Sequence, residues 1–461
     1  MHYPSTLLER CRRMTPLALP ALFLALAPTA GAQEAEIVAE VVATTTTPTP
    51  IDTGNSAWMI TAAALVVAMC IPGLAMFYAG LVRTKNLLSV FSQFFAAAGV
   101  IAVLWVIFGY TIATDATGMQ EGVFNLHSFI GGSSNLFLAG IKQGTVNGDG
   151  IPESVIVTFL LSFAIITPAI VAGGFAERMK FISAVLFLAL WFSFVYAPVS
   201  HMVWGGPGSL MANWGVLDFA GGTAVHINSG VAALACALVV GKRSGYPKTA
   251  MPPHNLGLCL AGAGFVWLGW FGFNAGSAVA VNGSTGMALM NTELAACAGV
   301  LGWGIVEWLK NGKPSALGLA SGALAGLVGV TPGCAYLSAM GALVIGLVAG
   351  AVCFVFVAVV KRRFGYDDTL DAFGLHGVGG VVGALLTGVF AAQSLGGSED
   401  ISIATQLVAQ FKGVIFTIVY TFVISWVILK LIDLTVGLRV DPETEYAGLD
   451  ETEHGEKGYN L

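Results

Sequence analysis

The sequence predicts an all-α integral membrane protein with eleven transmembrane helices, arranged as a 5+5 inverted repeat plus one C-terminal helix. Three observations support this prediction. The chain has 461 residues, of which 56% are hydrophobic and only 10% charged, whereas ordinary soluble domains carry roughly 25% charged residues. Long apolar segments follow one another, and the loops between them alternate between many and few basic residues. A motif in the fifth segment also recurs in the tenth.

The first 55 residues are expected to lie outside the membrane bundle. Basic residues within 10–13 precede an apolar stretch at 17–27, and small residues at 30–32 form a cleavage pattern. The apolar stretch is shorter than the roughly 20 residues that span a bilayer. Residues 1–32 are therefore interpreted as a cleaved signal peptide, which places the mature N-terminus outside the cytoplasm. Residues 33–55, rich in Thr and Pro, are interpreted as a flexible linker.

The helical bundle is expected within residues 56–436. Each apolar segment there is long enough to cross a bilayer. Several contain Gly or Pro, which transmembrane helices tolerate when they pack against neighbours. In chain order the predicted segments are 57–81, 88–113, 154–176, 181–199, 219–241, 255–280, 288–309, 315–333, 336–360, 373–394 and 408–434.

The distribution of basic residues predicts the orientation of the bundle. Of the twenty Lys and Arg, three lie in the signal peptide and fifteen lie in loops after odd-numbered segments or near the C-terminus. Only Lys142 and Lys412 fall on the other side. Because cytoplasmic loops are enriched in Lys and Arg, we expect a multi-pass protein of the inner membrane with a periplasmic N-terminus. Residues 437–461 then form a cytoplasmic regulatory tail.

The recurring motif predicts the relation between the two halves of the bundle. An aspartate stands eight residues before a histidine, and a Gly-Val pair begins four residues after it, first at Asp218 and His226 and again at Asp368 and His376. The copies are five segments apart, and because five is odd they enter the membrane from opposite sides. This is typical of an inverted-topology repeat, in which the functional centre lies near the midplane. We expect the two histidines to meet there.

His226 and His376 are the only two of the seven histidines that lie inside apolar runs. Ionisable side chains inside a membrane are costly and usually functional, although a helix–helix hydrogen bond is the alternative. Two adjacent imidazoles suit a small polar substrate or a relayed proton. A metal site needs three or more ligands, and no third ligand matches, so neither a metal nor a cofactor is predicted. No nucleophile–base pair stands beside the histidines, which argues against an enzyme.

Two residues near the fifth segment allow alternative interpretations. Asp218 is expected to cap the helix through the amides of Gly221 and Thr223, and the alternative is a direct cation ligand. Trp204 lies in an outer loop, where it would anchor the chain at the membrane interface or bind a cation on its ring face.

Two further acids, Asp368 and Asp371, stand before the second histidine. They follow the basic run at 361–363. Local ion pairing and helix capping therefore account for both of them.

Three motifs together resemble the ammonium transporter family (Amt/MEP/Rh), most closely its bacterial Amt type. They are Asp218-Phe-Ala-Gly-Gly-Thr-Ala-Val-His-Ile-Asn228, Gly269-Trp-Phe-Gly-Phe-Asn-Ala-Gly-Ser277 and Asp371-Ala-Phe-Gly-Leu-His-Gly377. The resemblance runs from about Ser56 to the C-terminus. It implies an eleven-helix fold, a homotrimer and one pore in each subunit.

The resemblance also implies a role for each matching residue. An outer site would bind ammonium, a pair of stacked rings would gate the pore, and two histidines would line it, with one further aromatic beside them. The outer site corresponds to Phe163, Trp204, Ser277 and Asp218, the gate to Phe163 and Phe273, the pore histidines to His226 and His376, and the pore-side aromatic to Trp270.

The function implied is ammonium or ammonia transport across the cytoplasmic membrane, in which ammonium is deprotonated at the outer site and ammonia passes the twin histidines. The alternatives are an ammonium sensor with little conduction and an Rh-type neutral gas channel. The tail resembles the family tail that docks a PII-type signal protein, and the alternative is a solvated acidic tail. The net charge of −6 argues against a nucleic-acid partner.

Overall fold

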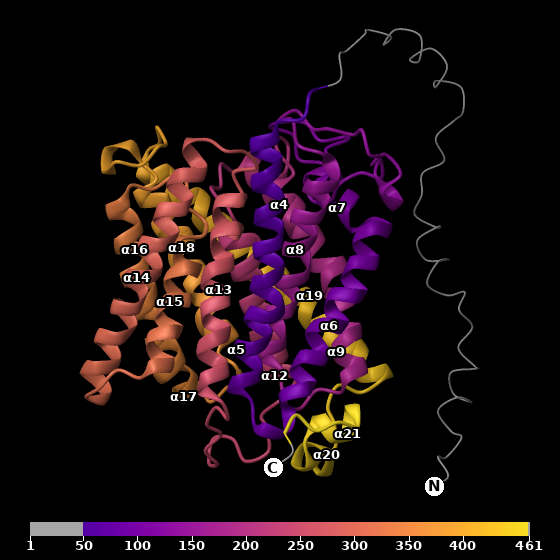
Figure 1. Cartoon of the computed structure of the whole chain (residues 1–461), viewed down its shortest axis with the longest axis vertical. Coiled ribbons are helices and arrows are strands. Elements are labelled where there is room, and N and C mark those ends of the chain that lie inside the picture. The colour runs from indigo at the N-terminus through magenta and orange to yellow at the C-terminus, as the bar shows by residue number, and fades with distance from the viewer. Residues whose placement is uncertain (1–48, 460–461) are drawn as a thin grey trace. The chain divides into compact units, whose positions relative to one another are not determined.

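The computed structural model describes residues 49–459, and its regular structure is helical (Figure 1). The predicted signal peptide at 1–32 and the linker residues up to 48 lie outside the described residues. The first helix of the described residues begins at Thr53, three residues before the predicted start of the bundle. Asp52 caps this helix, because its carboxylate accepts a hydrogen bond of 2.8 Å from the backbone N–H of Asn55.

The helices of the bundle follow the predicted segments closely. Several segments are divided by a kink or a wider turn into two helices. In chain order they are α4 (Thr53–Ala68), α5 (Ala75–Leu81), α6 (Leu87–Leu104), α7 (Tyr110–Thr114), α8 (Glu153–Val171), α9 (Phe181–Trp191), α10 (Ala197–Trp204), α12 (Asn228–Val240), α13 (Leu256–Gly276), α14 (Gly283–Asn311), α15 (Ala316–Val330), α16 (Ala339–Val355), α17 (Lys361–Phe364), α18 (Val378–Phe390) and α19 (Ile403–Thr435). Three short helices lie outside them: α11 (Leu210–Asn213), α20 (Pro442–Ala447) and α21 (Leu449–His454).

Ten of the described helical runs are long and apolar enough to cross a membrane. The eighth predicted segment, 315–333, is the exception, because α15 has only 15 residues. Eleven of the 15 residues of α15 are buried, and the irregular chain that follows it up to Leu337 is largely covered as well. Non-helical backbone at membrane depth is tolerated where protein surrounds it. The number of complete crossings, predicted as eleven, therefore stays a prediction.

The helix contacts repeat between the two halves of the bundle. In the first half α4 packs on α8, α6 on α9, and α8 on α12. In the second half α13 packs on α15, α14 on α16, and α15 on α18, which are the equivalent pairs. The long helix α19 contacts α9, α12 and α18 and so joins both halves. This pattern agrees with the predicted 5+5 repeat and one additional helix.

The fifth and tenth segments begin with equivalent wide turns. Residues Gly222–Ile227 and Phe373–Gly377 each form a π-type turn directly before α12 and α18. Such turns are rare and occur often at functional sites. Each of the two contains one of the predicted histidines.

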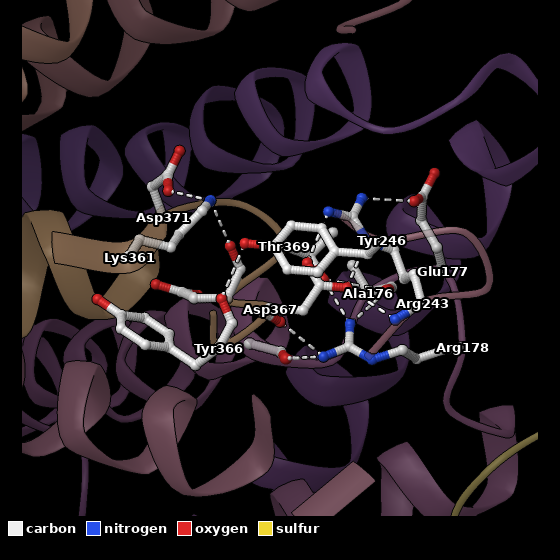
Figure 2. Close-up of polar contacts among 12 residues, drawn as sticks. Ala176, Glu177, Arg178, Arg243, Tyr246, Lys361, Tyr366, Asp367, Thr369 and Asp371 are labelled. Carbon is white, nitrogen blue, oxygen red and sulfur yellow. Dashed lines mark hydrogen bonds and ion pairs between the residues drawn. The ribbon is translucent and has the colours of Figure 1, made fainter. Parts of the chain in front are cut away.

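Buried ion pairs join the loops at the end of the bundle where residues 437–459 pack, which we call the tail face (Figure 2). Arg243 donates to Glu177 at 2.8 Å and to Asp367 at 2.8 and 2.9 Å. Burial alone would raise the pKa of Glu177, but the charges of Arg243 and Arg83 outweigh it and hold that pKa below its ordinary value. Two of the basic residues that indicate the orientation are thus also buried structural groups, Arg178 and Arg243.

The tail is folded onto this face. The backbone N–H of Lys180 donates to Leu438 at 2.9 Å, and that of Val440 donates to Arg178 at 3.1 Å. Glu445 is 1% exposed and accepts hydrogen bonds from the backbone N–H of Ser244 and from Arg439, both at 2.7 Å. These contacts argue against the alternative of a merely solvated tail.

Candidate functional site

Three aromatic rings form the part of the site that lies farthest from the tail face. The rings of Phe163 and Phe273 are stacked, with centroids 4.1 Å apart and planes inclined by 22°. Trp204 meets Phe163 edge to face at 6.0 Å. Phe163 is 1% exposed and Phe273 is fully buried. The stacked pair therefore closes the space between the surface and the interior with hydrocarbon.

A cavity of about 270 Å³ opens beside these rings, and we call it the aromatic cavity. Phe163, Trp204, Phe219 and Ser277 are among its lining residues. The Ser277 hydroxyl donates to the Phe273 carbonyl at 2.8 Å, so its oxygen lone pairs remain able to accept. The aromatic cavity thus combines ring faces with hydroxyl groups, among them those of Ser277, Ser200 and Thr114, which suits a small cation that carries N–H groups.

Asp218 supports the aromatic cavity from below. Its backbone carbonyl accepts a hydrogen bond of 2.9 Å from the indole N–H of Trp204. Its carboxylate accepts four backbone hydrogen bonds, from residues 221–224, at 2.7 to 3.1 Å. The predicted amide donors, Gly221 and Thr223, are two of the four. Asp218 thus caps the turn that carries His226, and its charge stays buried beneath the cavity.

The two histidines lie in contact beyond the stacked rings. The Nδ1 atoms of His226 and His376 are 3.2 Å apart, and the ring centroids are 5.3 Å apart. His226 also stacks on Phe273 at 5.8 Å and on Trp270 at 5.2 Å. Since one Nδ1 must donate and the other must accept, a neutral pair holds opposite tautomers. The Nε2 atom of His226 is buried without a hydrogen-bond partner among the described residues.

Two glycines let the helices that carry the histidines approach closely. A Cβ atom on Gly230 would lie 2.1 Å from the backbone nitrogen of Gly377. A Cβ atom on Gly380 would lie 2.9 Å from the carbonyl oxygen of Gly222. Each glycine stands four residues after a histidine, so a glycine permits the close backbone approach in both copies of the motif.

One supporting residue was missed by the sequence analysis. The indole N–H of Trp270 donates to the Thr331 hydroxyl at 3.0 Å, and that hydroxyl donates to the Leu327 carbonyl at 2.7 Å. Thr331 lies just after α15, 61 positions beyond Trp270. Its sequence context holds no signal for this contact, because a threonine at a helix end is common.

The arrangement is a buried line of groups. From the aromatic cavity it passes the ring stack and then the imidazole pair. Within residues 49–459, no three His, Cys, Asp or Glu side chains gather in a way that would hold a metal ion. The groups present can therefore bind a small cation at one end and exchange protons at the imidazoles.

Comparisons with known proteins agree on one family. The model of the Ammonium Transporter Family matches residues 57–459. The ammonium transporter of Aquifex aeolicus is 45% identical over 413 residues, which cover 89% of this chain and 94% of that protein. The ammonium transporter of Bacillus subtilis is 45% identical over 401 residues, which cover 86% and 96%.

Solved structures give the same result. The crystal structure of Candida albicans Mep2 matches with a TM-score of 0.79 at 32% identity and covers 89% of this chain and 94% of that one. A structure titled Sensor Amt Protein matches with a TM-score of 0.79 at 28% identity and covers 87% and 98%.

Proposed function

This chain belongs to the ammonium transporter family and shares its transport function, and we propose that it moves ammonium by deprotonating it at the aromatic cavity and passing ammonia along the histidines. The observation that carries this proposal is the order of the groups. The stacked Phe163–Phe273 pair stands between the cation-binding cavity and the joined imidazoles.

Ammonium is recruited in the aromatic cavity by the ring faces of Trp204 and Phe163 and by the Ser277 oxygen. Cation–π attraction contributes roughly 0.5–2 kcal/mol, and more when the ring is desolvated. Asp218 adds its buried negative charge from below but does not act as a ligand, because its carboxylate already accepts four hydrogen bonds. The cavity therefore favours a small cation without holding it tightly.

The ring stack selects the neutral species. An ion that leaves water for a hydrocarbon environment loses tens of kcal/mol of solvation by Born estimates, whereas neutral ammonia loses far less. Ammonium can release a proton and an alkali cation cannot. Deprotonation before the stack thus acts as the selectivity filter, and His226 and His376 offer a separate route for the released proton.

We place the aromatic cavity on the periplasmic side of the inner membrane and the tail face in the cytoplasm. The distribution of Lys and Arg supports this orientation. A thiol-reactive reagent that does not cross membranes tests it in a Cys297→Ala background. Glu456→Cys should react only in inside-out vesicles, and Gln120→Cys should react only in right-side-out vesicles.

Two partners complete the proposal. We infer a homotrimer with one pore in each subunit from the family resemblance. We also propose that a PII-type signal protein docks at the tail face. The tail there is folded, with Glu445 and Asp450 buried against the bundle and other acidic residues of α20 and α21 exposed. Native mass spectrometry of the purified protein with and without a PII protein checks both partners.

Currents across a solid-supported membrane that carries proteoliposomes test the transport mechanism. An ammonium pulse should give a sustained current. Trp204→Leu should raise the half-saturating concentration about tenfold, because a loss of about 1.4 kcal/mol changes affinity tenfold. His376→Leu should abolish the current.

Other results would identify the alternatives. A brief transient alone would indicate a sensor. Rapid alkalinisation of the vesicle lumen without current would indicate a neutral gas channel. A His376→Leu protein that still moves charge at the normal rate would contradict the proton route.

A further inference from the structure

Two cavities with charged residues in their lining lie at the tail face, on the far side of the histidines from the aromatic cavity. One has a volume of about 340 Å³ and is lined by Phe77 and by Leu375, the residue before His376. The other has a volume of about 520 Å³ and extends toward Arg243 and Tyr246. Under the proposed function, the first cavity is where substrate leaves the histidines.

One ion pair borders both cavities. Lys361 begins α17, and Asp371 stands just before the wide turn that carries His376. Both residues line the 340 Å³ cavity and also the 520 Å³ cavity. Figure 2 shows the Lys361 amine directed at the Asp371 carboxylate. The pair therefore stands where the path from the histidines opens toward the tail face.

The Lys361 amine occupies a cation site formed by one side-chain carboxylate and one backbone carbonyl. Its Nζ atom lies 2.5 Å from Oδ1 of Asp371 and 2.9 Å from the backbone carbonyl of Asp368. A carboxylate and a carbonyl are the oxygens that a free ammonium ion would take as hydrogen-bond acceptors. Asp371 holds a positive φ of 60°, and such backbone strain in a residue other than glycine persists only where the surroundings enforce it.

We propose that Lys361 occupies an inner ammonium site with its own ammonium group and thereby prevents free ammonium at the tail face from binding there. This inference rests on the proposed function and on its orientation. The lysine head group has the charge and the N–H donors of the substrate, but it is tethered to α17. The outer face recruits ammonium in the aromatic cavity, whereas residues 49–459 form no second cavity of this kind at the tail face.

Removal of the tether is expected to open the inner site. Lys361→Met leaves Asp371 and the Asp368 carbonyl in place without a cation. In inside-out vesicles that receive ammonium chloride pulses, the half-saturating concentration should fall about tenfold relative to the unmodified chain. In right-side-out vesicles it should stay unchanged, because the aromatic cavity is untouched.

A neighbouring residue provides the matched control. Arg362 lines the same two cavities, and no ion pair joins it to a described residue. Arg362→Met removes one positive charge from the lining of the same two cavities. It should leave the half-saturating ammonium concentration unchanged in both inside-out and right-side-out vesicles. Addition of Asp371→Asn to Lys361→Met should cancel the gain, because the carboxylate that would hold free ammonium is then gone.

The inference is overturned if Lys361→Met leaves the inner-face value unchanged while the outer-face currents are normal. A gain of the same size in Arg362→Met would also overturn it, since simple charge removal would then suffice. Absence of ammonium current in the unmodified protein from either face would contradict the proposed function instead. Lys361→Gln carries the same expectations if the methionine variant does not assemble.

Discussion

Gly230 and Gly380 determine how closely the two histidine-bearing helices approach. Both stand four residues after a histidine, and each faces the backbone of the other repeat within contact distance. The 3.2 Å contact between the imidazoles depends on this approach. A side chain at either glycine would have to push apart two backbones rather than displace a flexible neighbour.

Gly230→Ala is expected to destabilise the protein by about 1–3 kcal/mol, because overpacking in a filled core costs that much. Its Cβ atom would lie 2.1 Å from the Gly377 nitrogen. The ammonium current should fall with the separation of the imidazoles. Gly264→Ala on α13 is the control, since nothing lies within 4 Å of its added Cβ atom. Equal melting temperatures in detergent for the two variants would contradict the argument.

Thr331→Val should leave the Trp270 indole N–H without an acceptor, since Thr331 holds it at 3.0 Å. An unsatisfied buried donor costs about 1–3 kcal/mol, which thermal unfolding would detect. Thr417→Val is the matched control, because the Thr417 hydroxyl is buried and already lacks a partner among the described residues. That variant should be neutral or slightly stabilising. A larger loss in Thr417→Val than in Thr331→Val would refute the assigned roles.

The sequence allowed prediction of the meeting of His226 and His376, because the inverted repeat relates distant positions by symmetry. The capping role of Asp218 was predictable from local spacing, and its hydrogen bond from the Gly221 N–H confirms it. The pairing of Asp371 with a residue of the basic run 361–363 was predictable in the same way, and the contact with Lys361 confirms it. Thr331 was not predictable. It contacts Trp270 across 61 positions, and neither spacing nor composition encodes that distance.

At the scale of the element, hydropathy located the helices well because lipid and protein interior both require apolar side chains. It located the ends less well. The fourth segment, predicted to end at 199, continues to Trp204, and the fifth begins at Gly222 rather than at 219. The wide turns at Gly222–Ile227 and Phe373–Gly377 were missed, because a π-type turn has the same apolar composition as an α-helix.

The short helix α15 shows a second limit of hydropathy. The segment 315–333 is apolar over 19 residues, but only 15 of them are helical. The residues of the segment that follow α15 are buried, and the backbone N–H of Phe219 donates to the Pro332 carbonyl at 2.9 Å. A profile of single residues cannot distinguish apolar chain that is covered by protein from apolar chain that is covered by lipid.

Helix α20 attaches to the bundle through Glu445, and Glu445→Gln should loosen it. The substitution weakens the hydrogen bonds from Ser244 and Arg439, which are charge-assisted and worth roughly 1.5–3 kcal/mol to a charged group. Amide hydrogen exchange in residues 437–454 should rise severalfold. Glu443→Gln on the same helix is exposed and should leave the exchange unchanged. An unchanged exchange pattern in Glu445→Gln would show that other contacts hold the tail.

At the scale of the whole molecule, the ion pairs of the tail face should make stability depend on pH. Burial opposes ionisation of Glu177 and Asp367, but Arg243 and its neighbours hold the pKa values of both carboxyls below the ordinary 4.5 and 3.8. Below about pH 4.5 the unfolded chain therefore binds more protons than the folded one. The stabilisation is fully present above that pH and is lost as the pH falls through the folded-state pKa values.

Arg243→Met isolates this effect from other titrating groups. Removal of one partner from a buried ion pair costs about 3–5 kcal/mol near neutral pH. The difference in melting temperature between the unmodified chain and the variant should be largest at pH 7 and should narrow toward pH 3. A difference that stays constant across this range would show that the carboxylates contribute nothing through their charge.

The saturated carboxylate of Asp218 has a consequence for alkali metals. A carboxylate offers about four lone-pair directions, and main-chain amides use four here. A sodium or potassium ion that entered the aromatic cavity would have to exchange its hydration shell for aromatic ring faces and a few hydroxyl oxygens, because the carboxylate oxygens of Asp218 already accept backbone hydrogen bonds. Selection against such ions thus begins in the aromatic cavity, before they reach the stacked rings of Phe163 and Phe273.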